Sequence, residues 1–244
     1  LPILTADGTI SAAALIQDRK VLRYIGKKYI TARREMGFLV PSKGYEYATI
    51  KGHKCAIIVG DDLSRERDFD QSVETVISIN ARKYGKGTMI YRYEMMRNLA
   101  FVESKNLVLV NQVGGSTDIV YDGTSGALNS RGELVLMMKN FEEDFQIFDT
   151  KASARPITIP STYNDRTRLV YEAARCGLRD FFRKNGYRKA SIGLSGGIDS
   201  AVVACLAADA LGRQNIRALL LPSQFSSDHS VEDAKKLAEN LGSE

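Results

Sequence analysis

Residues 190–200 read ASIGLSGGIDS, and this stretch decides the fold of the second half of the chain. An apolar run of strand length leads into a glycine-rich loop, and the helix that follows is predicted to end at Gly212. The predicted order is strand, loop, helix, strand and helix over residues 190–194, 195–199, 200–211, 216–221 and 231–241. Because strands alternate with helices, this order predicts a parallel sheet of the Rossmann-like, doubly wound type.

The loop between the first strand and its helix has the composition of a phosphate site. The first backbone N–H groups of a helix point outward, and the helix dipole favours an anion there. Gly196 and Gly197 are expected to adopt positive φ and to let the main chain approach a ligand, while the hydroxyls of Ser195 and Ser200 donate to phosphate oxygens. The carboxylate of Asp199 would repel phosphate unless a cation lay between them, so Asp199 is predicted to bind Mg²⁺. A plain helix cap is the alternative.

The string SGGIDS resembles the PP-loop of ATP pyrophosphatases, SGG[IVL]DS. It differs from the pattern GxxxxGK[ST], because no Lys follows a Gly. The resemblance implies an enzyme that adenylates a carboxylate or carbonyl group and releases pyrophosphate. The loop alone leaves GMP, asparagine, argininosuccinate and NAD synthetases as alternatives.

Residues 221–242 favour the last of these. They read LPSQFSSDHSVEDAKKLAENLG, which is similar to the stretch MPSxYSSxxSxxDAxxLAxNLG of NAD synthetases. The resemblance implies that Ser223, Ser226 and Ser227 help to bind ATP, and a solvated turn with a helix cap is the alternative for each. His229 is interpreted as a surface residue without a role.

The first half of the chain has an α/β pattern of its own. Strands are predicted over 55–59 and 107–110, covered on both faces, with hairpins over 14–25 and 128–137 and a helix over 91–104. Residues 149–163 contain Pro156 and Pro160 and have no helical period. After this break a helix is predicted, capped by Asn164 or Asp165 and ended by Gly186. We therefore predict a first domain over 1–149, a linker over 150–163 and a second domain over 164–244.

Three motifs relate the first domain to a second known fold. NQVGG at 111–115, DGTS at 122–125 and FEED at 141–144 resemble, in order and spacing, NQVGGQDxxxFDGxS and FxED in the glutaminase domain of glutamine-dependent NAD synthetases. That domain belongs to the nitrilase, or carbon-nitrogen hydrolase, superfamily. The resemblance implies part of a nitrilase-like α-β-β-α sandwich, followed by part of the PP-loop domain.

The catalytic residues of that superfamily are only partly matched. The resemblance implies a Cys nucleophile, a Glu base and a Lys that stabilises the intermediate. The motif [LI]CEDLW appears as IVGDDLS, so Gly60 stands where the nucleophile is expected. Lys27 matches the catalytic Lys, with Lys28 as the competing alignment, and the Glu base would lie before Leu1. The stretch NASPF, which helps to bind glutamine, appears as NARKY at 80–84. We therefore expect no glutamine hydrolysis, whether Gly60 is an engineered change or, as Asp61 and the altered 80–84 favour, natural drift.

Composition limits the other function classes. The 244 residues include 34 Lys and Arg and 29 Asp and Glu. The small net charge of +5 suits anionic ligands without indicating nucleic acid. Cys55, Cys176 and Cys205 form no CxxC pair and are predicted to be reduced core thiols. Cys55 lies roughly 16 Å along an extended strand from position 60, too far to replace a nucleophile. No leader and no apolar run of ~18 residues is visible, so a cytoplasmic enzyme without a membrane partner is expected.

The sequence as a whole predicts a ligase that forms AMP and pyrophosphate. Its reaction would be amidation of deamido-NAD to NAD through an acyl-adenylate, with ATP and Mg²⁺ as cofactors and ammonia as nitrogen source in place of glutamine. The abrupt ends at Leu1 and Glu244 suggest a fragment, with further deamido-NAD contacts outside it. The resemblance also implies a homo-oligomer. The alternatives are another PP-loop ligase and a catalytically inactive scaffold subunit.

Overall fold

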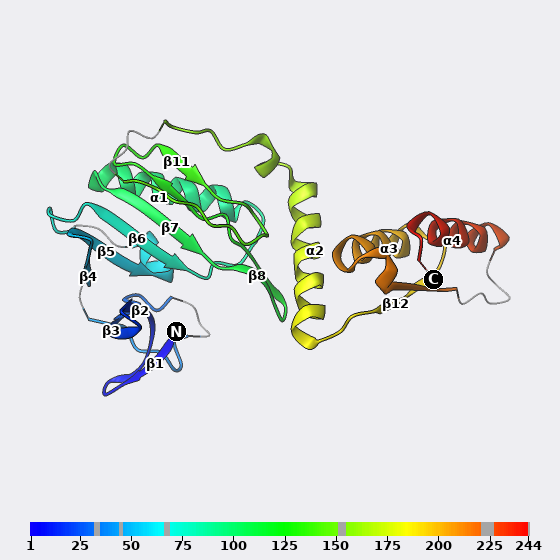
Figure 1. Cartoon of the computed structure of the whole chain (residues 1–244), viewed down its shortest axis with the longest axis horizontal. Coiled ribbons are helices and arrows are strands. Elements are labelled where there is room, and N and C mark those ends of the chain that lie inside the picture. The colour runs from blue at the N-terminus through cyan, green and yellow to red at the C-terminus, as the bar shows by residue number, and fades with distance from the viewer. Residues whose placement is uncertain (32–34, 44–45, 66–68, 151–154, 221–226, 244) are drawn as a thin grey trace. The chain divides into compact units, whose positions relative to one another are not determined.

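The computed structural model describes residues 1–31, 35–43, 46–65, 69–150, 155–220 and 227–243. The chain forms two compact units (Figure 1). The first unit comprises Leu1–Val113 and Tyr121–Pro160, and the second comprises Gly114–Val120 and Ser161–Glu244. The predicted domain limits at 149 and 164 stay a prediction.

A six-stranded sheet is the centre of the first unit, with the strand order β11-β10-β7-β6-β5-β4. The strands are β4 (Tyr47–Ile50), β5 (His53–Val59), β6 (Thr75–Asn80), β7 (Asn106–Asn111), β10 (Gly126–Leu128) and β11 (Leu134–Met137). β5, β6 and β7 are mutually parallel, whereas the remaining pairs in the sheet are antiparallel. The carboxyl ends of three central strands therefore meet at one edge.

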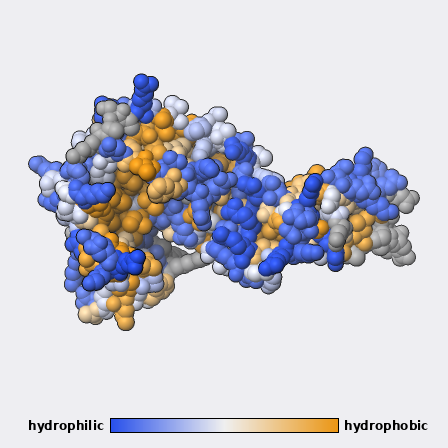
Figure 2. Space-filling model, viewed as in Figure 1, coloured by the Kyte–Doolittle hydropathy of each residue, from blue (hydrophilic) through white to orange (hydrophobic). Residues whose placement is uncertain are grey.

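Helix α1 (Thr88–Glu103) covers one face of this sheet. Met96 of the helix and Leu107 of β7 are fully buried there. Side chains on the opposite face are partly open, with Ile79 39% and Val110 49% exposed. Figure 2 shows this hydrophobic surface over the sheet, where a cavity of about 610 Å³ lies. The prediction of cover on both faces is confirmed for 55–59, where Cys55, Ala56, Ile58 and Val59 are buried, and is wrong for 107–110, where Val110 is half exposed.

Two smaller sheets complete the strands of the first half. β1 (Pro2–Thr5), β2 (Gly8–Gln17) and β3 (Lys20–Gly26) form an antiparallel sheet, which confirms the predicted hairpin. β8 (Val113–Ser116) and β9 (Ile119–Asp122) pair as a hairpin. Helix α1 begins at Thr88, earlier than predicted, because Gly87 adopts a left-handed conformation and starts it.

The second unit confirms the predicted order of elements. Its members are α2 (Arg166–Asn185), β12 (Ala190–Leu194), α3 (Ile198–Leu211), β13 (Ile216–Leu220) and α4 (Asp228–Leu241). β12 and β13 are parallel, as predicted. Asp165 caps α2 by accepting a hydrogen bond from the Arg168 N–H at 3.0 Å, and Gly186 ends it in the left-handed conformation.

Two helix starts differ from the prediction. Helix α3 begins at Ile198, so the loop is shorter and Asp199 lies in the first helical turn. Helix α4 begins at Asp228, because the Ser227 hydroxyl caps it by accepting from the Ser230 N–H at 3.2 Å. A core of Leu194, Ala204 and Ala234 joins these helices to β12.

All three cysteines are free thiols, and Cys55 and Cys176 are buried. The prediction of a core position is wrong for Cys205, which is exposed on α3. Across the described ranges, no helix combines the length and the apolar character needed to cross a bilayer.

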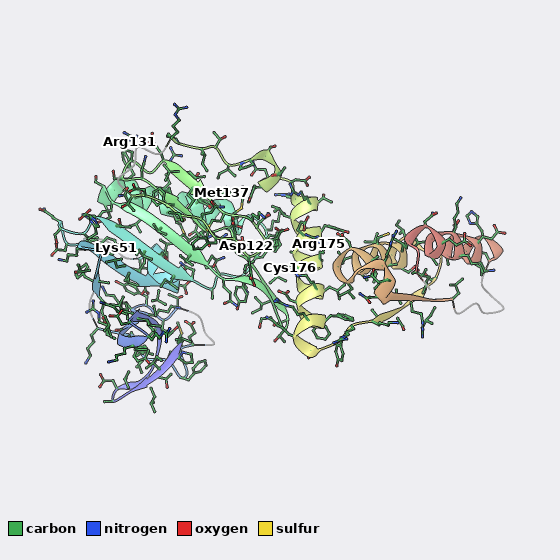
Figure 3. The ribbon with its side chains drawn as sticks, in the orientation of Figure 1. Lys51, Asp122, Arg131, Met137, Arg175 and Cys176 are labelled. Atoms are coloured by element: carbon green, nitrogen blue, oxygen red, sulfur yellow. The ribbon has the colours of Figure 1, made fainter. Side chains whose placement is uncertain are left out.

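A buried ion pair links α1 to Asp122, the last residue of β9. Both terminal nitrogens of Arg92 donate to the carboxylate of Asp122, at 3.1 and 2.7 Å. Arg92 is 1% and Asp122 2% exposed. Figure 3 marks Asp122 among the inner side chains, whereas Arg131 lies at the periphery. This paired fork holds charges that would be unfavourable if either were left alone.

Replacing Arg92 with Met should lower the free energy of unfolding by about 3–5 kcal/mol, because Asp122 is left as a buried, uncompensated charge. Urea denaturation measures this loss. Arg131→Met, which breaks the exposed Arg131–Glu133 pair, is the matched control and should change stability little. Equal losses in the two variants would contradict the assignment.

Candidate functional site

The glycine-rich loop lies between β12 and α3 and brings two predicted hydroxyls together. Ser195 Oγ lies 3.1 Å from Ser200 Oγ, and Ser200 Oγ donates to the Gly197 carbonyl at 2.9 Å. The first backbone hydrogen bond of α3 runs from the Ala201 N–H to the Gly197 oxygen. The N–H groups of residues 198–200 precede this bond and point out of the helix end. The loop therefore presents hydroxyl and N–H donors at the positive end of a helix dipole.

The two loop glycines have different roles. Gly196 has φ +80, and a Cβ there would lie 2.3 Å from the Ser230 carbonyl oxygen of α4. Gly197 has φ −88, so the expectation of positive φ is wrong for this residue. Its added Cβ would meet Ser195 Oγ at 3.4 Å, an ordinary contact. Glycine is thus required at position 196, where the loop packs on the first turn of α4. Position 197 has room for a larger residue.

Asp199 is the predicted Mg²⁺ ligand, and it lies exposed in the first turn of α3. No group of three or more His, Cys, Asp or Glu side chains in the described ranges could hold a metal. Mg²⁺ commonly uses one or two carboxylates together with substrate phosphates and water. The single carboxylate at the loop therefore fits a cation bound mainly by ligand oxygens, and does not form a protein cage.

The serine-rich loop before α4 is only partly described. Ser223 and Ser226 lie outside the described residues, whereas Ser227 is the N-cap of α4. A cavity of about 270 Å³ lies between the glycine loop and α4, and Gly196, Gly197, Ser200 and Asp233 are among its lining residues. The structure thus brings the start of α4 beside the loop. His229 is exposed and pairs with Asp233 at 2.9 Å.

A separate group of predicted residues meets at the carboxyl edge of the six-stranded sheet. A Cβ at Gly60 would lie 3.4 Å from Lys27 Cε and 3.5 Å from Lys27 Nζ. Lys28, the competing alignment, instead places its ammonium over the Tyr29 ring, at 5.4 Å from the centroid. This geometry favours Lys27 as the lysine that faces position 60.

Sequence reasoning missed the partners of Lys27. Its ammonium donates to Glu35 Oε2 at 2.7 Å and to Asp61 Oδ2 at 3.2 Å. Asp61 also accepts from Thr31 Oγ1 at 2.5 Å and pairs with Arg82 at 3.3 Å. No sequence signal identifies Thr31, because its partner Asp61 is 30 residues away along the chain. Glu35 was missed because its contact with Lys27, eight residues earlier, follows no helical or strand spacing.

These contacts set the protonation of the cluster. Burial alone would lower the pKa of Lys27, but hydrogen bonds and charges from Glu35 and Asp61 raise it above its ordinary value. Burial alone would raise the pKa of Asp61, but Thr31, Lys27 and Arg82 hold it below its usual range. Both groups are therefore charged at neutral pH.

Two further motif residues position the edge. Asp62 is buried and accepts from the backbone N–H groups of Lys28 and Tyr29 at 2.8 and 2.9 Å. Asn111 accepts from the Arg82 N–H at 2.9 Å and donates to Asp122 at 3.0 Å. These hydrogen bonds hold the backbone at residues 28, 29 and 82. The matched motifs therefore stabilise the structure at this edge.

Known proteins share both parts of this arrangement. The sequence profile of the family described as NAD synthase matches residues 170–244. The glutamine-dependent NAD(+) synthetase of Synechocystis is 35% identical over 254 residues, which cover 95% of this chain and 45% of that protein. Over nearly all of its length the chain is therefore similar to the glutamine-dependent NAD(+) synthetases. It spans about half the length of the curated relatives it matches.

Solved structures of this family and of a related fold agree with the architecture. The glutamine-dependent NAD+ synthetase of Acinetobacter baumannii, in complex with ADP, has a TM-score of 0.84 at 28% identity. The alignment covers 99% of this chain and 48% of that one. A CN-hydrolase superfamily protein of Xanthomonas campestris has a TM-score of 0.50 at 14% identity, covering 70% of this chain and 66% of its own, and shows the fold alone. The predicted α/β class, nitrilase-like and then Rossmann-like, is confirmed.

Gly196→Ala should lower the free energy of unfolding by about 1–3 kcal/mol, because it combines a positive φ with a collision against Ser230. Gly197→Ala is the matched control, since the same methyl group meets ordinary contacts there, and its loss should stay below about 1 kcal/mol. Denaturant unfolding of the two variants measures the difference. A larger loss for Gly197→Ala would contradict the loop geometry.

Asp61→Asn should make stability less sensitive to acid. Because the pKa of Asp61 is lowered by folding, its contribution is present above its unfolded value of about 3.9 and is lost as pH falls through the folded value. The stability gap between the parent and the variant should therefore narrow as pH falls from about 5 to 3. Urea titrations at several pH values measure it, with the exposed Asp118→Asn as control. A gap independent of pH would count against the ion pairs.

Proposed function

We propose that this chain carries the ATP-binding part of a ligase that converts deamido-NAD to NAD. The carrying observation is the loop at the start of α3, where the Ser195 and Ser200 hydroxyls lie 3.1 Å apart beside the helix N-terminus. The NAD synthase match over 170–244 and the ADP complex of the Acinetobacter relative support this proposal. A cytoplasmic location and self-association belong to the same proposal.

The proposed chemistry has two steps. The nicotinate carboxylate attacks the α-phosphorus of ATP, forming an acyl-adenylate as pyrophosphate leaves. Ammonia then attacks the acyl carbon, and AMP leaves with the C–O bond electrons while the nitrogen loses a proton to solvent. Ser195, Gly196, Gly197 and Ser200 hold the phosphate groups, and Ser223, Ser226 and Ser227 contribute from the next loop. Mg²⁺ bound by Asp199 would supply positive charge to the phosphate oxygens.

We further propose that the nitrogen donor is free ammonia. Position 60 carries no side chain to attack an amide, and φ +62 at Gly60 makes any other residue there strained. Lys27 lies beside position 60, but its ammonium forms ion pairs with Glu35 and Asp61. The same observation favours a second candidate, an inactive scaffold subunit, if the second unit binds no nucleotide. Another PP-loop ligase with a different acceptor is the remaining alternative.

The full-length protein with ATP, Mg²⁺ and deamido-NAD should release pyrophosphate with ammonium and not with glutamine. Ser200→Ala should reduce turnover by about 10- to 100-fold, because it removes one charge-assisted hydrogen bond to phosphate. Ser191→Ala is the matched control, since it makes the same change on exposed β12 outside the loop, and it should leave the rate unchanged.

Each other outcome identifies an alternative. Turnover with glutamine would contradict the interpretation of Gly60. Pyrophosphate release with xanthylate or aspartate, and not with deamido-NAD, would identify another PP-loop ligase. Absence of nucleotide binding and of turnover would leave the scaffold subunit.

A further inference from the structure

Two cations and two carboxylates surround Gly60 in the first unit. Lys27 pairs with Glu35 and with Asp61, and Asp61 pairs in turn with Arg82. These four side chains, here called the ion-pair lock, come from three chain segments around residues 27–35, 60–64 and 82. Their formal charges sum to zero.

The burial of Lys27 explains why the carboxylates are needed. Its side chain is 5% exposed, whereas Glu35 and Asp61 remain about one third open to water. A buried ammonium without an anionic partner is strongly unfavourable and tends to lose its proton. The two carboxylates keep Lys27 protonated, and each accepts a hydrogen bond from its ammonium group.

Arg82 pairs with the second carboxylate oxygen of Asp61. Its Nη2 lies 3.3 Å from Asp61 Oδ1, while Lys27 and Thr31 contact Oδ2. The backbone of Arg82 is itself fixed by Asn111, which accepts from its N–H. Asp61 is thus held on both oxygens by groups that the sheet edge positions.

We propose that this cluster now serves as a structural lock, which joins three segments and leaves no uncompensated positive charge at position 60. Lys27 is then retained as a member of a charge-balanced packing unit, although no nucleophile faces it. This inference does not rest on the proposed ligase activity, because it concerns only contacts within the first unit.

A thiol placed at position 60 reports the charge there. A Cβ at Gly60 would lie within 3.6 Å of three Lys27 atoms, in ordinary contact. An uncompensated lysine lowers the pKa of a neighbouring thiol, which otherwise titrates near about 8.5. A lysine whose charge is cancelled by two carboxylates leaves the thiol at or above that value.

The test introduces Gly60→Cys together with Cys205→Ser, because Cys205 is the exposed native thiol and the other two are buried. The rate of alkylation by iodoacetamide, measured against pH, gives the pKa of the new thiol. We expect a value at or above about 8.5, and adding Asp61→Asn should lower it by about one unit or more. Asp70→Asn is the matched control, since it removes the carboxylate of the Lys54–Asp70 pair near the amino end of β6 and should not move the thiol.

Three results would overturn the lock. The first is a thiol pKa well below its ordinary value in the Gly60→Cys protein. The second is an ordinary value that Asp61→Asn leaves unchanged. The third is an equal shift in the Asp70→Asn control.

A second measurement covers the case in which Gly60→Cys does not fold, since φ is +62 at this position. With Gly60 intact, the urea midpoints of Lys27→Met, Asp61→Asn and the double variant are compared. The lock predicts that the double variant loses less than the sum of the two single losses, because each single change strands a charge. Additive losses would overturn the proposal.

Discussion

The buried pair between Arg92 and Asp122 anchors a chain of contacts that reaches the edge of the sheet. Asp122 accepts from the Asn111 amide at 3.0 Å, and Asn111 accepts from the backbone N–H of Arg82. The Arg82 side chain then pairs with Asp61, which contacts Lys27. The buried ion pair is therefore connected, through this series of contacts, to charged groups at the sheet edge that are distant from it along the chain.

This dependence gives the motif residues around Gly60 a structural role. Asn111, Asp122 and Asp62 belong to stretches that resemble the family, and each is buried and hydrogen-bonded to a backbone or side-chain group. Removing any of them would leave a buried polar partner unsatisfied, which is unfavourable irrespective of catalysis. These three residues therefore contribute to stability whether or not the edge is catalytic, whereas the constraint at position 60 is its backbone, since φ +62 favours glycine.

The sequence was informative where the determining contacts are local. The alternation of strand and helix after residue 164, the Asp165 cap and the Gly186 stop each depend on neighbours within a few residues, and the structure confirms them. The same reasoning failed for Gly197, which is the N-cap of α3 and therefore has an extended conformation with φ −88. It could not find Glu35 or Thr31, because only the folded chain brings Glu35 to Lys27 and Thr31 to Asp61.

The two candidate sites occupy the same kind of place in their folds and differ in the charged groups that they contain. Both lie beyond the carboxyl ends of parallel strands, where the fold gathers loop residues. At Gly60 the charged groups satisfy one another at distances from 2.7 to 3.3 Å, so little is left for a ligand. At the glycine loop the hydroxyls and N–H groups contact one another at 3.1 to 3.3 Å, and Ser200 Oγ donates to the Gly197 carbonyl at 2.9 Å, but these groups are uncharged and their hydrogen bonds are exposed. An anion can replace those weak contacts with stronger, charge-assisted ones. Topology therefore places both sites, and the pairing of their polar groups decides which one remains open to chemistry.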